Sequence, residues 1–147
     1  GVVSHFNGVV WGPKPSGSAN AFEGVHMFAE DDIFAVGWYQ VRHFDGDSWK
    51  PMQGNTSKNL RGVWGATNQD VWAVGNYGQI IRYDGSFWKT ELTGTNQNLR
   101  AVWGSSDNDV FIVGEGGTIL HWDGFELLPM PVNTLQTFED VDRKSVV

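Results

Sequence analysis

The sequence has 147 residues, enough for one domain with a hydrophobic core, and 40% of them are hydrophobic, which excludes a disordered chain. Its net charge of −7 at pH 7 excludes nucleic acid as the expected partner, because phosphate binding needs an excess of lysine and arginine. It has no cysteine, so disulfides and thiolate metal sites are excluded, and no apolar run approaches the ~20 residues of a membrane-spanning helix.

Short strand-like segments follow one another along the chain, separated by turns rich in Gly, Asn and Asp. The second unit shows the pattern, with strands predicted over residues 61–65, 71–75, 79–83 and 87–91. The glycine that follows Asn or Asp in the last turn of each unit recurs at intervals of 38, 39 and 39 residues: Gly8, Gly46, Gly85 and Gly124. No segment keeps a helical period, and four-stranded units of this length are typical of β-propeller blades.

The repeat divides the chain into three whole units and two partial ones. We predict a late half-blade over residues 1–21, blades over 22–59, 60–98 and 99–134, and an early half-blade over 135–147. The last of these is taken to start at Leu135-Gln136-Thr137-Phe138, aligned with Leu99-Arg100-Ala101-Val102. The fold class is therefore all-β, with four blade units of antiparallel strands in one propeller domain. The split unit also predicts a fragment of a larger propeller, or half of a ring completed by a homo-oligomer.

The repeated motif resembles that of known propeller families. It is Val-Trp-Gly, then Asp-Val-Trp-Ala-Val-Gly, then Asp-Gly-x-x-Trp, seen in full over residues 63–88. It resembles repeats of bacterial photosystem-II assembly-factor-like proteins and, more distantly, BNR (Asp-box) repeats, over essentially the whole chain. The resemblance implies an interaction platform in a secreted, periplasmic or cell-surface protein. The turn Asp84-Gly85-Ser86-Phe87-Trp88 departs from the Asp-box, which argues against sialidase activity.

Two columns of polar residues recur in the units without predicting a metal or cofactor site. The Asp-Gly column suits left-handed turns, in which the carboxylate accepts backbone N–H groups. A second column holds His5, His43 and His121, with Arg82 in the remaining unit. Propeller symmetry spreads these side chains around the ring, whereas zinc needs three or four convergent ligands. We therefore expect both columns to be structural.

The candidate binding residues lie at one predicted end of the blades. The second residue of each unit is polar or charged, and on an innermost strand this column would form a ring at the pore mouth: Glu23, Arg61, Arg100 and Gln136. The turns after the second strands open on the same side and carry Trp38, Asn76, Tyr77 and Glu115. Loops 13–21, 53–59 and 93–98 lie there too. Pairing of Glu23 with Arg61 or Arg100 is the alternative to ligand binding.

No catalytic pattern is present: the sequence contains no metalloprotease motif, no phosphate-binding glycine loop and no cysteine nucleophile. We predict a protein that is not an enzyme and that binds a protein partner through its loops and pore mouth. A lectin-like propeller that binds glycans between its blades is an alternative. A further alternative is an excised or designed fragment without a ligand of its own.

Overall fold

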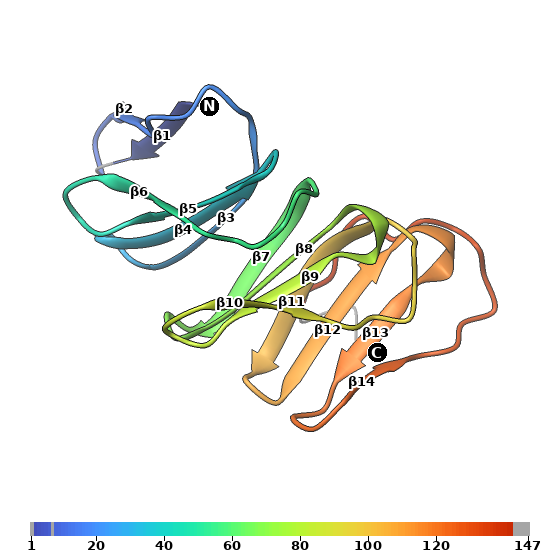
Figure 1. Ribbon diagram of the computed structural model, residues 1–147. Helices are drawn as coiled ribbons and strands as arrows, with labels where there is room; N and C mark the ends of the chain where they lie inside the picture. Colours follow the sequence, from blue (N-terminus) through green and yellow to red (C-terminus); the bar gives the residue numbers. More distant parts are fainter. Residues whose placement is uncertain (1, 7, 143–147) are drawn as a thin grey trace.

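The computed structural model describes residues 2–6 and 8–142, and nearly all their regular structure is β (Figure 1). An N-terminal hairpin is followed by three four-stranded sheets. The hairpin is β1 (Val2–Phe6) and β2 (Trp11–Pro15). The first sheet is β3 (Phe22–Ala29), β4 (Asp32–Gly37), β5 (Gln40–Phe44) and β6 (Trp49–Met52).

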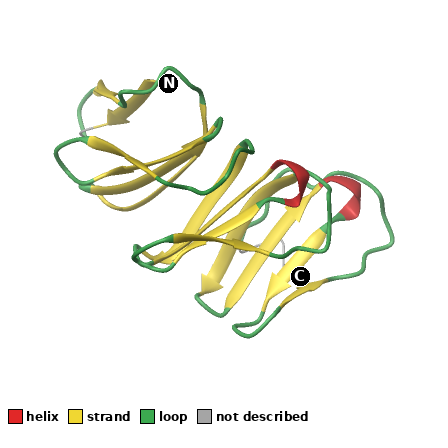
Figure 2. Cartoon of the chain, viewed as in Figure 1, coloured by secondary structure: helices red, strands yellow, loops and turns green. Residues whose placement is uncertain are grey.

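The second sheet is β7 (Leu60–Thr67), β8 (Asp70–Gly75), β9 (Ile80–Tyr83) and β10 (Trp88–Glu91). The third is β11 (Leu99–Ser106), β12 (Asp109–Gly114), β13 (Ile119–Trp122) and β14 (Leu127–Pro129). One-turn helices η1 (Asn76–Gly78) and η2 (Glu115–Gly117) lie at the same end of their sheets (Figure 2). None of the described residues belongs to a helix that is long and apolar enough to cross a membrane.

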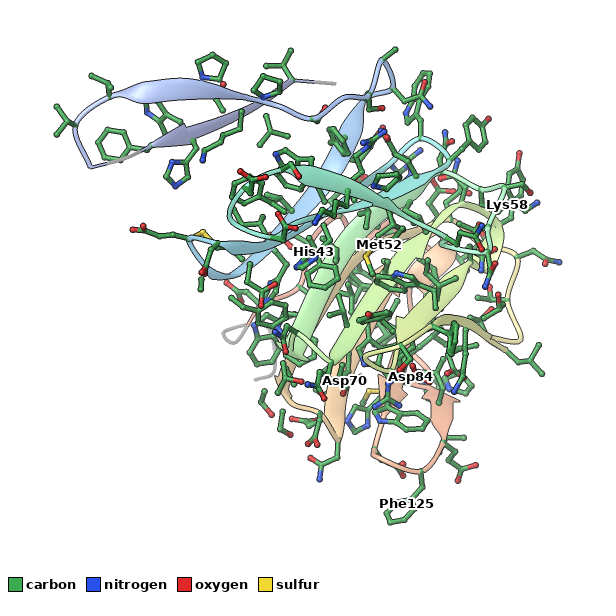
Figure 3. All side chains as sticks on the ribbon, turned by 60° about the vertical axis from the view of Figure 1, so that its left-hand side comes forward. His43, Met52, Lys58, Asp70, Asp84 and Phe125 are labelled. Atoms are coloured by element: carbon green, nitrogen blue, oxygen red, sulfur yellow. The ribbon has the colours of Figure 1, made fainter. Side chains whose placement is uncertain are left out.

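Within each sheet every strand pairs antiparallel with the next strand in the chain. This order gives the sheets two distinct ends. The "loop end" holds the starts of β3, β7 and β11, the turns between second and third strands, and the loops that join the sheets. The "turn end" holds the other turns, between first and second strands and between third and fourth strands. Figure 3 shows Lys58 and Phe125, from the two ends, far apart.

Neighbouring sheets pack face to face, with the second strand of one sheet against the first and second strands of the next. Trp72 and Val74 of β8 lie in the core with Val110 and Ile112 of β12. Both faces of β8 are covered, so its apolar run is continuous rather than alternating. The innermost strands approach closely: a Cβ at Gly24 would stand 2.9 Å from the carbonyl oxygen of Arg61 in the next sheet. Glycine at this position therefore allows the first strands to lie side by side.

The Asp-Gly turns have the structural role that the sequence predicts. Asp84 Oδ1 accepts hydrogen bonds from the backbone N–H groups of Ser86 and Phe87, at 3.0 and 2.9 Å. The glycine that follows has a φ of +88°, in the left-handed region. A hydrogen bond from Lys89, then those from the two N–H groups, hold the pKa of Asp84 well below its usual range. The same backbone arrangement recurs at Asp45 and Asp123.

The alignment predicted for the last unit is wrong by three residues. The backbone N–H of Gly117 donates to the carbonyl of Gln136 at 2.9 Å, as Gly78 donates to Gln97 at 2.8 Å. Gln136 therefore corresponds to Gln97, and Phe138 rather than Leu135 corresponds to Leu99. The error arose because Leu135 matches Leu99 in type, while the backbone bonds follow the 39-residue spacing. No strand occurs over residues 130–142, and residues 143–147 of the predicted half-blade lie outside the described residues.

Candidate functional site

At the loop end, the predicted binding residues are bonded to one another in a repeating way. The second residue of each unit reaches the first residue of the turn after the second strand in its own sheet. Trp38 Nε1 donates to Glu23 Oε1 at 2.9 Å, and Arg61 Nε donates to Asn76 Oδ1 at 2.7 Å. In the third sheet Arg100 forms an ion pair with Glu115. All eight predicted residues thus lie at the loop end, since Tyr77 is next to Asn76 and the carbonyl of Gln136 pairs with Gly117, but the side chain of Gln136 takes no part in this repeating pattern.

Weaker ion pairs link these groups between units. Arg61 Nη1 lies 3.6 Å from Glu23 Oε2 of the preceding sheet. Arg100 Nε lies 3.8 Å from Glu139 Oε2. About one-quarter to one-third of each side chain is exposed in Glu23, Arg61, Arg100 and Glu115, whereas the side chain of Glu139 is mostly exposed. The pairing of Glu23 with Arg61, which the sequence left as an alternative, is therefore present.

Gln136 does not belong to this row of second residues. Its side chain is exposed, and its backbone pairs with Gly117 as described above. Glu139 occupies the position instead and contacts Arg100. Sequence reasoning missed Glu139, although Phe138-Glu139 repeats Phe22-Glu23 and could have revealed it.

Two tyrosines project from the tips of the same turns. Tyr39 and Tyr77 are 62% and 65% exposed, and both have a φ of +57°. This left-handed conformation costs a residue with a Cβ roughly 1–2 kcal/mol, and in the third sheet glycine, Gly116, occupies it without that cost. Tyr39 was not among the predicted binding residues, although it matches Tyr77 one unit earlier.

The two tyrosine turns are connected by the loop between the first and second sheets. Asn59 forms an isolated β-bridge with Trp38, and its carbonyl accepts a hydrogen bond from Asn76 N at 2.9 Å. The adjacent Lys58 places its Nζ 4.7 Å from the centre of the Tyr77 ring. Trp38, itself half exposed, thus adjoins the Tyr77 turn through two residues of one loop. We call Trp38, Tyr39, Lys58 and Tyr77 the aromatic ridge.

The acidic side chains of the loop end are paired with neighbouring side chains. Glu23 accepts a hydrogen bond from Trp38. Glu115 accepts one from Asn98 and forms an ion pair with Arg100. Within residues 2–6 and 8–142, no three His, Asp or Glu side chains are placed to hold one metal ion. The site therefore offers fixed charges, amide groups and exposed rings, which suit hydrogen bonding and stacking with a ligand.

At the turn end, the second polar column is paired with acidic residues inside each sheet. His43 Nε2 and His121 Nε2 each lie 2.7 Å from a carboxylate oxygen, of Asp32 and Asp109 respectively. Arg82 takes this role in the second sheet, with Nε 2.6 Å from Asp70. These contacts join neighbouring strands within one sheet, and such contacts fit the structural role expected for this column.

Comparison with known proteins agrees with this architecture. No family model and no curated protein matches the sequence. The solved structure of YCF48 bound to D1 peptide matches with a TM-score of 0.67 and 16% identity, over 88% of this chain and 46% of that chain. An ancestral GH74 enzyme matches with a TM-score of 0.70 and 16% identity, over 86% of this chain and 20% of that chain.

This chain is a β-propeller repeat protein. The predicted fold class is thus confirmed, and the chain corresponds to part of each matched propeller. Its three sheets are blades, and β3, β7 and β11 are their inner strands. At 16% identity the comparisons establish the fold alone, and they include a structure with a bound peptide as well as an enzyme.

Proposed function

We propose that this propeller is a non-catalytic binding protein that holds a protein partner on its loop end. The observation that carries the proposal is the pair of exposed tyrosines, Tyr39 and Tyr77, held in left-handed turns. Backbone strain at exposed aromatic residues supports a functional role, because glycine would occupy the same turns at lower cost. Tyrosine and tryptophan also provide much of the binding energy in protein interfaces.

The charged side chains of the loop end suit a partner that offers hydrogen bonds from its side chains or backbone. Arg61 and Arg100 are held in place by Asn76 and Glu115, so a partner would meet them already oriented. The carboxylates Glu23 and Glu115 are each engaged by neighbouring side chains, which argues against a free catalytic acid or base. The YCF48 structure contains a bound peptide, which supports a search among protein ligands first.

The experiment is a selection of peptides from a random phage library on the immobilised chain, with affinities measured on synthetic copies. We expect the selected peptides to lose about tenfold or more in affinity for an Arg61→Ala/Arg100→Ala variant and for a Tyr39→Gly/Tyr77→Gly variant. Phe125→Ser is the matched control, because Phe125 is an exposed aromatic residue at the turn end. Peptides that bind both loop-end variants as tightly as the unchanged chain would refute the proposal.

A glycan ligand is the second candidate, supported by the half-exposed indole of Trp38 beside Tyr39. Exposed aromatic faces suit stacking against sugar rings, and repeated blades would add avidity. A broad glycan array, read with the unchanged chain and with the Tyr39→Gly/Tyr77→Gly variant, tests this. A hit lost in the variant supports a lectin, and an array without hits eliminates it.

A further inference from the structure

A groove of about 510 Å³ lies at the loop end between the second and third blades. One side is the loop that leaves β10, with Leu92 and Gly94, and the other side holds Leu120 of β13 and Leu127 of β14. The loop after β14 also lines it. Leu92 is 91% exposed. Both blades have all four of their strands, so the groove is formed between two whole blades.

The corresponding place between the first and second blades is closed by two side chains. Exactly one 39-residue repeat earlier, Asn55 and Trp88 stand where the groove has Gly94 and Leu127. Asn55 Nδ2 donates to the carbonyl oxygen of Trp88 at 3.1 Å, and Trp88 is buried. At Gly94, by contrast, an added Cβ would meet no atom within 4 Å. The groove is therefore open because glycine replaces asparagine and leucine replaces tryptophan.

The lining of the groove suits an uncharged ligand. None of the described residues that line it is charged, although charged residues make up 18% of the sequence. The hydroxyls of its four threonines each share a hydrogen bond with a backbone group: Thr93, Thr95, Thr118 and Thr134. A charged group that entered the groove would lose water without gaining an ion partner. The groove thus favours an apolar side chain.

The groove is continuous with the aromatic ridge. Thr93 Oγ1, in the wall of the groove, donates to the carbonyl oxygen of Gly78 at 3.0 Å. The N–H of Gly78 donates in turn to the carbonyl oxygen of Gln97, in the same loop, at 2.8 Å. Gly78 directly follows Tyr77, so two hydrogen bonds tie this wall to the turn that carries the exposed ring. A polypeptide held on the ridge would therefore extend directly into the groove.

We propose that the groove receives an aromatic side chain, tryptophan or phenylalanine, of the protein partner that binds the loop end. This inference rests on the proposed function, because it assigns a second contact to the same partner. An aromatic ring fits because the preceding blade holds the indole of Trp88 where the groove has the smaller Leu127. The ring would lie against Leu120 and Leu127, and buried aromatic anchors of this kind provide much of the binding energy in protein interfaces.

The test fills the groove with the residues found one blade earlier, in a Gly94→Asn/Leu127→Trp variant. Asparagine tolerates this left-handed turn, since Asn55 has a φ of +47° and Gly94 one of +68°. We expect N-acetyltryptophanamide to give a saturable saturation-transfer NMR signal with the unchanged chain, and the variant to lose it. Gly94→Asn alone is the milder second variant. Gly17→Asn is the matched control, because Gly17 occupies the same position of the N-terminal unit with a φ of +68°.

Peptides selected on the loop end separate this inference from the proposed function. Peptides that contain tryptophan or phenylalanine should lose about tenfold or more in affinity for the filled variant, and a similar factor when that residue becomes alanine. Circular dichroism spectra verify that each variant is folded.

Three results would overturn the assignment of the groove. These are an absent probe signal at millimolar concentration, an equal signal in the filled variant, and peptides that bind the filled variant with full affinity. If such peptides still lose affinity for the Tyr39→Gly/Tyr77→Gly variant, the groove fails and the proposed function stands. Peptides that lose affinity for the filled variant alone would support the groove and refute binding on the ridge.

Discussion

The two ends of the blades differ in how closely their side chains repeat from one blade to the next. At the turn end each blade repeats one arrangement: an Asp-Gly turn, and an aspartate at the start of the second strand bonded to His or Arg. At the loop end the corresponding positions hold different chemistry in every blade. Glu23 bonds Trp38, Arg61 bonds Asn76, and Arg100 bonds Glu115.

This contrast is what the proposed binding function would require. A contact that only holds a blade together works equally well in each copy, so the same residues suffice at the turn end. A binding surface gains specificity from differences between copies, which are found at the loop end. The strained tyrosines also belong to the loop end, and the third blade places glycine at the same turn.

The largest expected effect comes from the blade core, where Trp72 is fully buried. Trp72→Ala should lower the free energy of unfolding by about 3–5 kcal/mol, through lost burial and the cavity that remains. Trp38→Ala at the loop end should cost about 1 kcal/mol or less, because that indole is half exposed and loses one hydrogen bond. Urea unfolding followed by circular dichroism measures both. Equal losses would contradict the contrast between the buried core and the loop end.

The next effect concerns Arg82, which represents the paired column at the turn end. Its guanidinium bonds Asp70 and lies 4.6 and 5.0 Å from the ring centres of Trp72 and Trp122. Arg82→Ala should cost roughly 1–2 kcal/mol, because a partly shielded ion pair and two ring contacts are lost. Lys89→Ala is the control and should change little, since that lysine is largely exposed. Denaturant melts of the two variants test the difference.

A smaller effect is expected at the tyrosine turns. Tyr77→Gly removes a left-handed cost of roughly 1–2 kcal/mol and adds the chain entropy of glycine, about 0.5–1 kcal/mol. The unfolding free energy should therefore stay within about 1 kcal/mol of its original value or rise. Gly116→Ala is the reciprocal variant and should lower it. A clear loss of stability in Tyr77→Gly would mean that the ring is structural.

The smallest expected effect is on acid stability. The folded-state pKa of Asp84 is depressed, first by Lys89 and then by two backbone N–H groups. Its contribution is present above the unfolded value near pH 4 and is lost as pH falls through the folded pKa. Asp84→Asn should therefore reduce the loss of stability on acidification below pH 4. Urea melts at pH 6 and pH 2.5 test this, and an unchanged pH dependence would contradict it.

The sequence by itself determined the period, the four strands of each unit and the Asp-Gly turns. These features depend on local residues: alternating apolar positions, β-branched and aromatic side chains, and glycine where φ is positive. The 39-residue spacing then carried the propeller assignment. The same spacing aligns Phe138 with Leu99 and Glu139 with Arg100, whereas the residue type of Leu135 favours an alignment three residues earlier.

The tertiary structure decided which side chains meet. Sequence placed Arg61, Asn76 and Glu23 at one end of the blades, but only folded strands bring Arg61 within reach of both others. It likewise could not show that Tyr39 and Tyr77 are strained and exposed, or that a groove lies open beside Gly94 while Asn55 and Trp88 close the corresponding place. Repetition fixes each residue's place within a unit. Burial and partners depend on what lies next to that unit in space.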